Sequence, residues 1–408
     1  MDYPRIRNID AFPIESSGRP MICLRDPNNF TKEALMVPNN VFFILTLFDG
    51  NHTLLDIQAE YMRKFGELLY KERIVEIIEK LDSHLLLDSE RFKTFRDNLE
   101  DDFRRSNVRK AAHAGQSYDS EPEILKKQLE GFFLSPEGPG VLTSQEALGR
   151  VKGAIAPHID LKEGGPCFAW AYREIVEHSD ADLFIIFGTA HEETKNLFAF
   201  TKKDFETPLG IVETDREFLE IFDENYEYDL LADEFIYRSE HTIEFQLVFL
   251  QYLFGESREI KIVPVLCGSF HEMILGNTHP LETKQMHDFI EAFNAAISES
   301  KKKICMIASA DLAHIGPRYG DQYTPTPVTI REVKEDDLEL LGFAEKVNKD
   351  GFFSCIQKVR DRRRICGLPP IYTMLSVMDA SKGKLLKYST AQVDNQNSFV
   401  SFASMVFY

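Results

Sequence analysis

Short apolar runs, each followed within a few residues by a histidine, recur in the C-terminal part of the chain. They are Gly153 to Ala156 before His158, Leu183 to Phe187 before His191, and Ile304 to Ala308 before Asp311 and His314. A short apolar run between chain breakers is typical of a buried strand in an α/β sheet. Because open α/β sheets bind ligands at the carboxyl ends of their strands, we expect the residues after these runs to converge on one site.

Amphipathic segments alternate with the apolar runs. Predicted helices begin at Glu121, after His158, near Ser239, at Lys284, at Asp336 and at Pro369, and further predicted strands cover residues 260–266 and two runs close to the C-terminus. Alternating helices and strands predict a three-layer α/β fold. The two final runs follow one another without a helix, so we expect a mixed sheet rather than a purely parallel one.

The first hundred residues show a different pattern. Helical spacing predicts three short helices, over residues 41–47, from Thr53 onward and through Ile74 to Leu81, and the leucines at 85–87 predict a strand or wing. Residues 88–107 are polar with an apolar residue at every third or fourth position, which predicts one amphipathic connecting helix. We therefore predict a small winged-helix-like domain with its connecting helix over residues 1–106, and an α/β domain over residues 107–408.

Composition narrows the class of function. The 408 residues carry a formal net charge of −19, which argues against general binding to a phosphate backbone. The N-terminal residues lack the apolar region of a secretory signal, and no apolar run reaches the ~20 residues that span a bilayer. The six cysteines are scattered without a CxxC pair, as is typical of reduced thiols. We expect a cytoplasmic protein that binds neither nucleic acid nor membrane.

A polar pair lies in the apolar segment SEHTIEFQLVFL. His241 and Glu244 are three residues apart, so they would share one face of a helix capped by Ser239. Polar side chains on so apolar a helix must be buried with partners or face a cavity. We expect both residues to contribute to the site.

Cys366 follows an arginine-rich segment and precedes a predicted helix start. Two hypotheses fit this cysteine. With His158 and His191 it would provide the nitrogen and sulfur ligands that iron(II), copper and zinc prefer, with coordination positions left open. Alternatively, the arginines and the helix start would favour its thiolate, and Cys366 would be a nucleophile or redox thiol with a histidine as its base.

Each candidate also has a purely structural interpretation. A histidine at a strand end is commonly a polar residue of the rim, a lone cysteine is commonly a small buried apolar side chain, and an arginine run is commonly a solvated helix face. Asp311 and His314 could brace a turn through a local hydrogen bond. For any single residue the structural interpretation is preferred. The structural interpretation is less convincing for all the candidates together, because most of them are expected at one edge of the sheet.

Seven motifs occur in one order between residues 108 and 408: AGQSY, AIAPHID, IIFGTAH, SEHTIEFQL, IKIVPVLCG, ASADLAHIG and RICGLPP. In this order they resemble the Memo family, whose microbial members are named AmmeMemoRadiSam system protein B. The resemblance implies the doubly wound α/β fold of LigB-type class III extradiol dioxygenases, with copper or iron as the metal. It assigns metal ligation to His158, His191 and Cys366, and further pocket positions to Asp311, His314, His241 and Glu244.

Two positions depart from the family pattern. Ile159-Asp160-Leu161 replaces the usual Gly-Tyr of the first histidine motif, and Glu192 stands where a second histidine is common. Both changes alter the expected lining of the pocket, so the substrate of the family does not transfer to this chain.

The segment LFDGNHTLLDIQAEYMRKFG of the first domain, with the leucine spacing that follows it, resembles the PqqD-like family of small peptide-binding domains. This resemblance covers roughly residues 20–90. It implies that the domain recruits a peptide or protein substrate by pairing a strand with it. The alternative is a winged helix that only packs against the larger domain. The name of the larger domain's family also implies radical-SAM and AMMECR-type partner proteins.

Together these observations predict a non-haem metal oxidoreductase. Iron(II) or copper would be held by His158, His191 and Cys366, and zinc is the alternative ion. His158, His191 and Cys366 lie far apart in the sequence, so this prediction depends on their meeting in space.

The remaining candidates complete this hypothesis. His314, oriented by Asp311, would be the general acid or base, and His241 with Glu244 would hold the substrate. Two other functions fit the same residues. One is a non-enzymatic module that captures an anionic peptide through Arg362 to Arg364 and the histidines. The other is a metal-dependent hydrolase.

Overall fold

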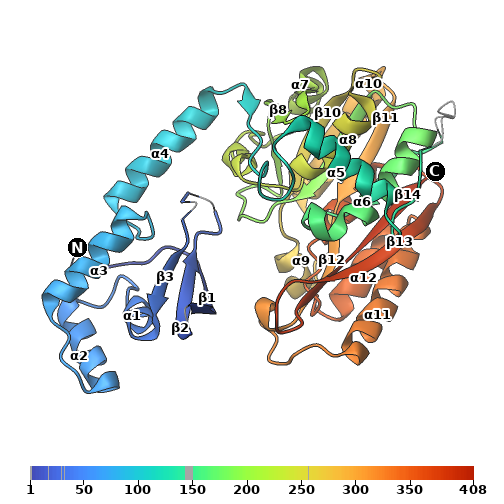
Figure 1. Ribbon diagram of the computed structural model, residues 1–408. Coiled ribbons are helices and arrows are strands. Elements are labelled where there is room, and N and C mark those ends of the chain that lie inside the picture. The colour runs from blue at the N-terminus through green and yellow to red at the C-terminus, as the bar shows by residue number, and fades with distance from the viewer. Residues whose placement is uncertain (1, 17, 29, 32, 143–149, 256) are drawn as a thin grey trace. The chain divides into compact units, whose positions relative to one another are not determined.

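The computed structural model describes residues 2–16, 18–28, 30–31, 33–142, 150–255 and 257–408. Within them the chain forms two compact units, Met1–Arg105 and Ser106–Tyr408 (Figure 1). The smaller unit contains a three-stranded sheet with helices, and the larger unit contains the α/β sheet that the apolar runs predict.

The described part of Ser106–Tyr408 is built on a mixed sheet of 11 strands in the order β12-β14-β5-β11-β6-β10-β9-β8-β4, with β13 beside β14 and β7 beside β10. The strands are β4 (Val108–Arg109), β5 (Gly153–Ala156), β6 (Leu183–Thr189), β7 (Phe198–Phe200), β8 (Asp204–Thr207), β9 (Gly210–Thr214), β10 (Lys261–Cys267), β11 (Ile304–Ser309), β12 (Asp311–Ile315), β13 (Gly383–Gln392) and β14 (Phe399–Phe407). β5, β11, β6 and β10 are parallel neighbours, whereas β13 and β14 are antiparallel. The predicted mixed α/β fold is confirmed.

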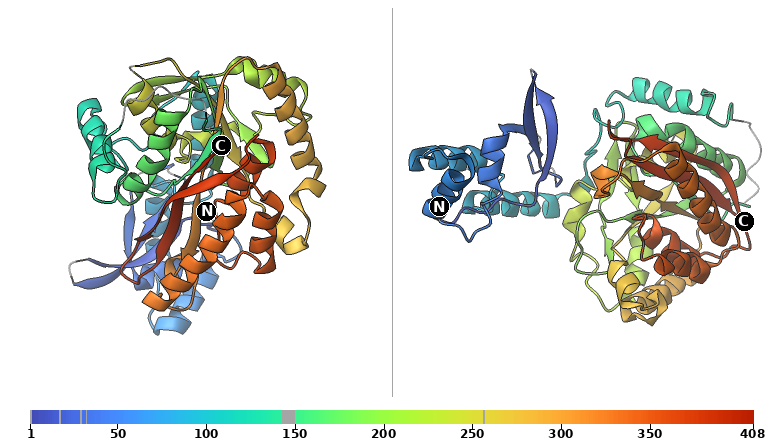
Figure 2. Two further views of the ribbon diagram at one scale, coloured as in Figure 1. Left: turned by 90° about the vertical axis from the view of Figure 1, so that its right-hand side faces the viewer. Right: turned by 90° about the horizontal axis from the view of Figure 1, so that it is seen from below.

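Helices cover both faces of this sheet (Figure 2). One face carries α5 (Pro122–Leu134), α6 (Leu161–His178) and α8 (Glu244–Phe254). The other face carries α7 (Arg216–Glu224), α9 (His271–Gly276), α10 (Lys284–Glu299), α11 (Pro327–Glu345), α12 (Lys349–Lys358) and α13 (Leu368–Val377). All seven residues of β6 are buried, because its apolar side chains are covered by helices on both sides.

The three apolar runs end at the same edge of the sheet, as predicted. Ser309 of β11 lies beside Ala156 of β5 and beside Gly188 of β6. Pro157 ends β5, because proline cannot donate the next ladder hydrogen bond. The side chains that follow β5 and β6 therefore start from neighbouring positions on the carboxyl edge, where α/β sheets bind their ligands.

Over its described residues the smaller unit contains an antiparallel sheet and four helices. The strands are β1 (Asp10–Ser16), β2 (Arg19–Arg25) and β3 (Leu35–Pro38), and the helices are α1 (Asn39–Leu45), α2 (Leu54–Phe65), α3 (Lys71–Ser83) and α4 (Glu90–Arg105). The predicted helices are present, and Thr53 caps α2 in a reciprocal pair with Asp56. The winged-helix-like assignment and the peptide-binding role stay predictions.

The predicted strand at residues 85–87 is wrong. Leu85 has a φ of 59°, which is left-handed backbone, and Leu87 makes only an isolated bridge with Ile6. Leu86 and Leu87 are buried, so this leucine run serves as core at a turn after α3. The strands of this unit are formed by residues 10–38, whose apolar and polar positions do not alternate regularly.

Over the described residues, no helix combines the length and the apolar character that a membrane span requires.

Candidate metal centre

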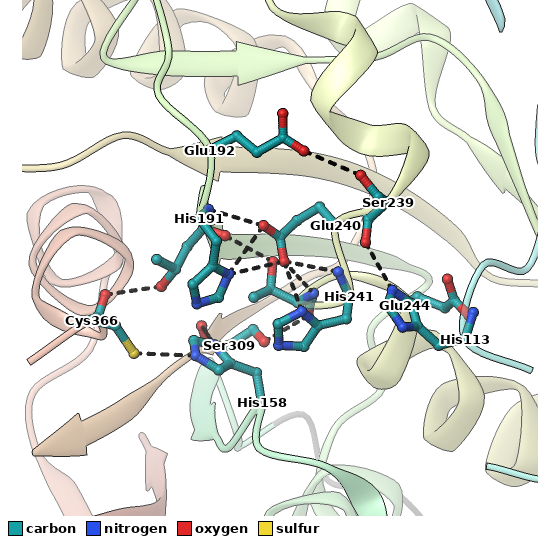
Figure 3. Close-up of polar contacts among 12 residues, drawn as sticks. His113, His158, His191, Glu192, Ser239, Glu240, His241, Glu244, Ser309 and Cys366 are labelled. Carbon is teal, nitrogen blue, oxygen red and sulfur yellow. Dashed lines mark hydrogen bonds and ion pairs between the residues drawn. The ribbon is translucent and has the colours of Figure 1, made fainter. Parts of the chain in front are cut away.

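Three histidines from separate elements meet at the carboxyl edge of the sheet. His158 follows β5, His191 follows β6 and His241 precedes α8. One ring nitrogen from each lies within 4.8 Å of those of the other two. The ring centroids are 5.2 Å apart for His158 and His191, 5.5 Å for His158 and His241, and 5.0 Å for His191 and His241. Figure 3 shows the three rings turned toward one another.

Each of these imidazoles is held through its Nδ1 atom. His158 Nδ1 lies 3.0 Å from the carbonyl oxygen of Ser309. His191 Nδ1 and His241 Nδ1 each lie 3.1 Å from a carboxylate oxygen of Glu240. An Nδ1–H that donates to such acceptors leaves Nε2 with its lone pair, and this arrangement is the common one for metal-ligating histidines.

Glu240 organises this group, although the sequence analysis did not single it out. Its side chain is 5% exposed and accepts backbone N–H bonds from His191 (3.0 Å), His241 (2.8 Å) and Thr242 (3.1 Å). Burial alone would raise the pKa of Glu240, but the charges and hydrogen bonds of His191 and His241 outweigh it and hold the pKa well below its usual range. Glu240 is thus a buried carboxylate that fixes two of the three rings.

Cys366 lies at the margin of this group. Its Sγ is 3.2 Å from His158 Nε2, and its backbone carbonyl accepts a hydrogen bond from the Thr189 hydroxyl at 2.9 Å. The set of mutually close ligand atoms contains His241 and not Cys366. The structure therefore brings together the two predicted histidines and the predicted cysteine, and adds a third imidazole. Which residues ligate a metal stays a prediction.

The hypothesis that arginines favour the Cys366 thiolate is wrong. Burial, followed by the charge of Asp311, raises the pKa of the Cys366 thiol well above its ordinary value. The arginines have carboxylate partners of their own: Arg362 with Asp336, Arg363 with Asp337 and Arg364 with Asp321. Their charge is therefore directed to those carboxylates, and burial disfavours the thiolate form of Cys366.

Asp311 and His314 both follow β11, but Asp311 does not orient His314 as predicted. Asp311 Oδ1 accepts the backbone N–H of His158 at 2.9 Å, and its Oδ2 lies 3.7 Å from His158 Nε2. His314 Nδ1 lies instead 3.1 Å from the carbonyl oxygens of Leu312 and Arg364. Burial raises the pKa of Asp311 to about 7 and lowers the pKa of His314 to about 4.

Glu244 does not share the site with His241 in the way that the spacing predicted. It is the first residue of α8, whereas His241 lies before the helix, so the two side chains diverge. Glu244 has no exposed side-chain surface and accepts four hydrogen bonds. The donors are the Arg109 guanidinium, the Tyr118 hydroxyl and the backbone N–H groups of Ala112 and His113.

This buried carboxylate anchors the segment that precedes α5. Arg109 is fully buried as well and also donates to the carbonyl oxygens of Tyr237 (2.8 Å) and Glu240 (2.7 Å). The anchored segment brings the His113 ring within 5.7 Å of the His241 ring, and His113 Nε2 lies 2.8 Å from the carbonyl oxygen of Ser239. Glu244 therefore supports the site from behind His241.

A cleft of about 780 Å³ adjoins His191. Its lining includes Glu192, Lys195, Asn196 and His271. The side chain of His191 is 41% exposed, whereas that of His158 is 2% exposed. A small molecule can therefore reach the imidazole group from the His191 side, and the departure at Glu192 is part of that approach.

A second group with suitable ligand atoms lies on the outer side of α10, formed by His287, Asp288 and Glu291. His287 and Glu291 are exposed, and Asp288 already pairs with Lys284. Such a group is an ordinary charged helix surface, in contrast to the three imidazoles, each of which is held by a partner at Nδ1.

The fold and this constellation of histidines agree with the comparisons with known proteins. Residues 109–406 match the family model described as Memo-like protein. The chain belongs to the Memo family. A MEMO1 family protein of Aquifex aeolicus is 28% identical over 410 residues, which cover 99% of this chain and 100% of the relative. MEMO1 family proteins of Pyrobaculum aerophilum and Methanopyrus kandleri are each 30% identical, over 74% and 73% of this chain and 99% and 98% of the relatives.

The extent of these matches also distinguishes the two units of the chain. The Memo model begins at residue 109, after the end of α4, so the smaller unit lies outside it. The two archaeal Memo relatives match about three quarters of this chain over nearly their whole length, whereas the Aquifex relative matches almost all of it. The smaller unit is therefore an addition to the Memo domain that the Aquifex relative shares.

Proposed function

We propose that this Memo-family chain is a metal-dependent oxidoreductase with a single iron(II) or copper ion held by His158, His191 and His241. The observation that carries the proposal is the arrangement of the three rings, each of which donates from Nδ1 to a carboxylate or carbonyl and keeps Nε2 for the centre. Neutral imidazole is a preferred ligand of both ions. Three protein ligands also leave coordination positions open, as a catalytic metal requires.

Cys366 is proposed as the fourth donor. The 3.2 Å between Cys366 Sγ and His158 Nε2 would allow both atoms to bind the same ion. Because burial keeps the thiol protonated in the metal-free protein, ligation of Cys366 would release a proton. A thiolate ligand suits copper, iron and zinc alike, so Cys366 does not by itself distinguish these ions.

The surrounding residues supply binding and proton transfer. The bound ion would provide redox chemistry with O₂ or with an electron-donating substrate. A substrate in the cleft beside His191 lies on the open side of the imidazole group, and Glu240 keeps His191 and His241 in position for it. His314 presents Nδ1 to two carbonyl oxygens, so Nε2 is the atom through which it would exchange a proton, and its pKa of about 4 makes it a weak base.

Metal analysis of protein purified without oxygen tests this proposal. We expect close to one equivalent of iron or copper per chain in the wild type, with oxygen consumption when an electron donor is added. His241→Ala and Cys366→Ser distinguish the roles of the two additional residues. His241→Ala should lose most of the metal, whereas Cys366→Ser should retain metal at about 10-fold to 100-fold lower affinity. Zinc in the wild type without oxygen consumption would support the alternative of a metal-dependent hydrolase. Full peptide affinity without any metal would support the alternative of a binding module.

A second proposal concerns partners: the smaller unit recruits an extended peptide segment of a protein substrate. β3 is an edge strand of its sheet, and a groove of about 330 Å³ runs between β3 and α3. The groove is lined by Met36, Val37, Val41, Ile77 and Lys80 among others. An edge strand beside an apolar groove suits a peptide that adds a strand and places alternate side chains in the groove. The partner enzymes that the resemblance implies, of the radical-SAM and AMMECR types, would act on or present such a segment.

Peptides selected from a random displayed library against the whole chain test this partner proposal. Binding of the selected peptides should be lost in Met36→Lys, because Met36 is 51% exposed and lines the groove. The matched control is Leu55→Lys, at a residue of α2 that is 74% exposed and lies outside the groove. Equal loss in both variants, or no selected peptide, would contradict recruitment through β3.

A further inference from the structure

A second cleft of the larger unit lies at the edge of the sheet opposite the imidazoles. Its volume is about 580 Å³. Lys152 directly precedes β5, whose other end leads to His158, and Tyr408 follows β14, whose last residue pairs with the first residue of β5. The remaining lining residues are Arg150, His178, Lys382 and Lys384. This cleft therefore gathers the amino end of β5 and the outer strands β13 and β14.

The cleft carries four cations, and no carboxylate side chain is among its described lining residues. Arg150, Lys152, Lys382 and Lys384 are exposed, and none of them forms an ion pair with a described carboxylate. Acidic residues outnumber basic ones in the chain by 66 to 47, so a shortage of carboxylates does not explain the group. Four like charges around one concave surface repel each other and raise the local positive potential.

Nearby acidic groups are engaged with other partners. The carboxylate of Glu174 lies 3.6 Å from His178 Nε2 and 3.5 Å from the Tyr408 hydroxyl. Asp180 pairs with Lys303 at 2.7 Å. The carbonyl of His178 ends α6 and would repel an anion, but it already accepts the backbone N–H groups of Arg150 (2.9 Å) and Val151 (3.1 Å). The four cationic side chains of the cleft still outnumber these two acidic neighbours.

We propose that this cleft binds a small anion with two or more phosphate groups. Such an anion would neutralise the four side chains together, and the guanidinium of Arg150 can bind phosphate oxygens in a bidentate manner. The ring of Tyr408, with Lys382 Nζ 5.9 Å from its centroid, adds a flat wall against which a base or ring of the ligand can stack. The volume suits a small molecule. The phosphate groups can belong to a free polyphosphate or nucleotide, or to a phosphorylated lipid headgroup.

This inference is independent of the proposed metal chemistry, because the two sites share no residue. β5 and α6 nevertheless link them. β5 (Gly153–Ala156) lies between Lys152 of the cleft and Pro157, which precedes His158, and α6 runs from its N-cap Asp160, two residues after His158, to His178 in the cleft.

Calorimetric titration of the whole chain with inorganic triphosphate tests the proposal. We expect saturable binding that weakens as sodium chloride is raised from about 50 to about 200 mM. The double variant Lys382→Ala/Lys384→Ala should weaken it about tenfold or more, because two of the four cations are removed. The control variant Lys64→Ala/Lys71→Ala removes the same charge from exposed positions of the smaller unit and should bind triphosphate as the wild type does.

Two further probes identify the source of the phosphate groups. Titration with adenosine triphosphate tests stacking on Tyr408, and co-sedimentation with vesicles of phosphatidylglycerol and phosphatidylcholine tests a lipid source. Binding to either, lost in Lys382→Ala/Lys384→Ala and kept in the control, would support the cleft. The proposal is overturned if none of the three probes binds, or if both double variants weaken binding equally.

Discussion

The two edges of the large sheet differ in how their charges are matched. At the carboxyl edge the buried charged groups Glu240, Glu244 and Arg109 each have hydrogen-bond partners. At the amino edge four exposed cations surround a cleft whose described lining residues include no carboxylate side chain. The first arrangement fixes side chains in place before a ligand binds, although burying these charges has a desolvation cost. The second leaves a surface charge that an anion can neutralise.

This difference indicates which property of the protein a substitution at each edge should change. A buried charge that loses its partner destabilises the protein, because water cannot replace the partner. An exposed cation that is removed changes stability little, because water already solvates it. Substitutions at the carboxyl edge should therefore act on folding or on metal affinity, and substitutions at the amino edge should act on anion binding alone.

The largest effect is expected for Glu244→Gln. It leaves the guanidinium of Arg109 buried without its carboxylate, and we expect a loss of about 3 to 5 kcal/mol in the free energy of unfolding. Urea denaturation followed by circular dichroism measures this loss. The matched control is Glu206→Gln, which removes the partner of exposed Lys110 and should cost less than about 1 kcal/mol. Similar losses of stability in the two variants would show that burial of the Arg109–Glu244 pair does not increase the cost of breaking it.

The same pair gives a pH dependence of definite sign. Burial raises the pKa of Glu244, but the Arg109 charge and the hydrogen bonds outweigh it and lower the pKa below the ordinary 4.5. A carboxyl with a lowered folded pKa stabilises the protein above its unfolded pKa, and this stabilisation is lost as the pH falls through the folded value. The stability difference between wild type and Glu244→Gln should thus be full at pH 7 and shrink below pH 4.5. A difference that stays constant over this range would contradict the assignment.

A smaller effect is expected for Glu240→Gln. The variant keeps the size of the side chain but removes the charge that orients His191 and His241, and we expect a 10-fold to 100-fold lower metal affinity, or about 1.4 to 2.7 kcal/mol. Competition with a chromophoric chelator at pH 7 measures it. Glu192→Gln is the control, because Glu192 is near the site and accepts a hydrogen bond from the Ser239 hydroxyl. Unchanged metal affinity in Glu240→Gln would show that the charge of Glu240 is not needed to position the imidazoles for the metal.

The smallest effect is expected on stability at the amino edge. Lys382→Ala/Lys384→Ala should change the free energy of unfolding by less than about 0.5 kcal/mol. Any change should be stabilising and larger at low salt, because like charges are removed and screening is weak. Thermal unfolding at about 20 and about 500 mM sodium chloride checks this. A clear destabilisation at both salt concentrations would mean that these lysines have a structural role.

The fold was largely predictable from the sequence because its determinants are local. The runs that become β5, β6 and β11 are apolar throughout, and proline or glycine interrupts two of them near the predicted end. Their shared edge then follows from the rules of α/β sheets, which is why His158 and His191 could be expected to approach each other. The same reasoning gave a wrong prediction for the leucines at 85–87, because a buried turn and a buried strand can have the same apolar composition.

The partners of the site could not be predicted in the same way. His241 and Glu244 are three residues apart, which suggests one helical face, but α8 begins only at Glu244. The carboxylate that holds the imidazoles is Glu240, whose position beside a histidine in the sequence carries no periodic signal. Arg109 reaches Glu244 across 135 positions of the chain, and only the tertiary fold specifies that contact. Charged residues are read from sequence as exposed by default, so buried pairs are missed.

The metal content of the wild type beside His158→Ala tests the central claim most directly. Both are purified without oxygen, and iron, copper and zinc are measured per folded chain, with His287→Ala as a control at an exposed histidine of α10. The account predicts close to one metal ion in the wild type and in His287→Ala, and almost none in His158→Ala. Equal metal in all three proteins, or none in any of them after reconstitution with iron(II) and copper, would contradict a metal centre at the three imidazoles.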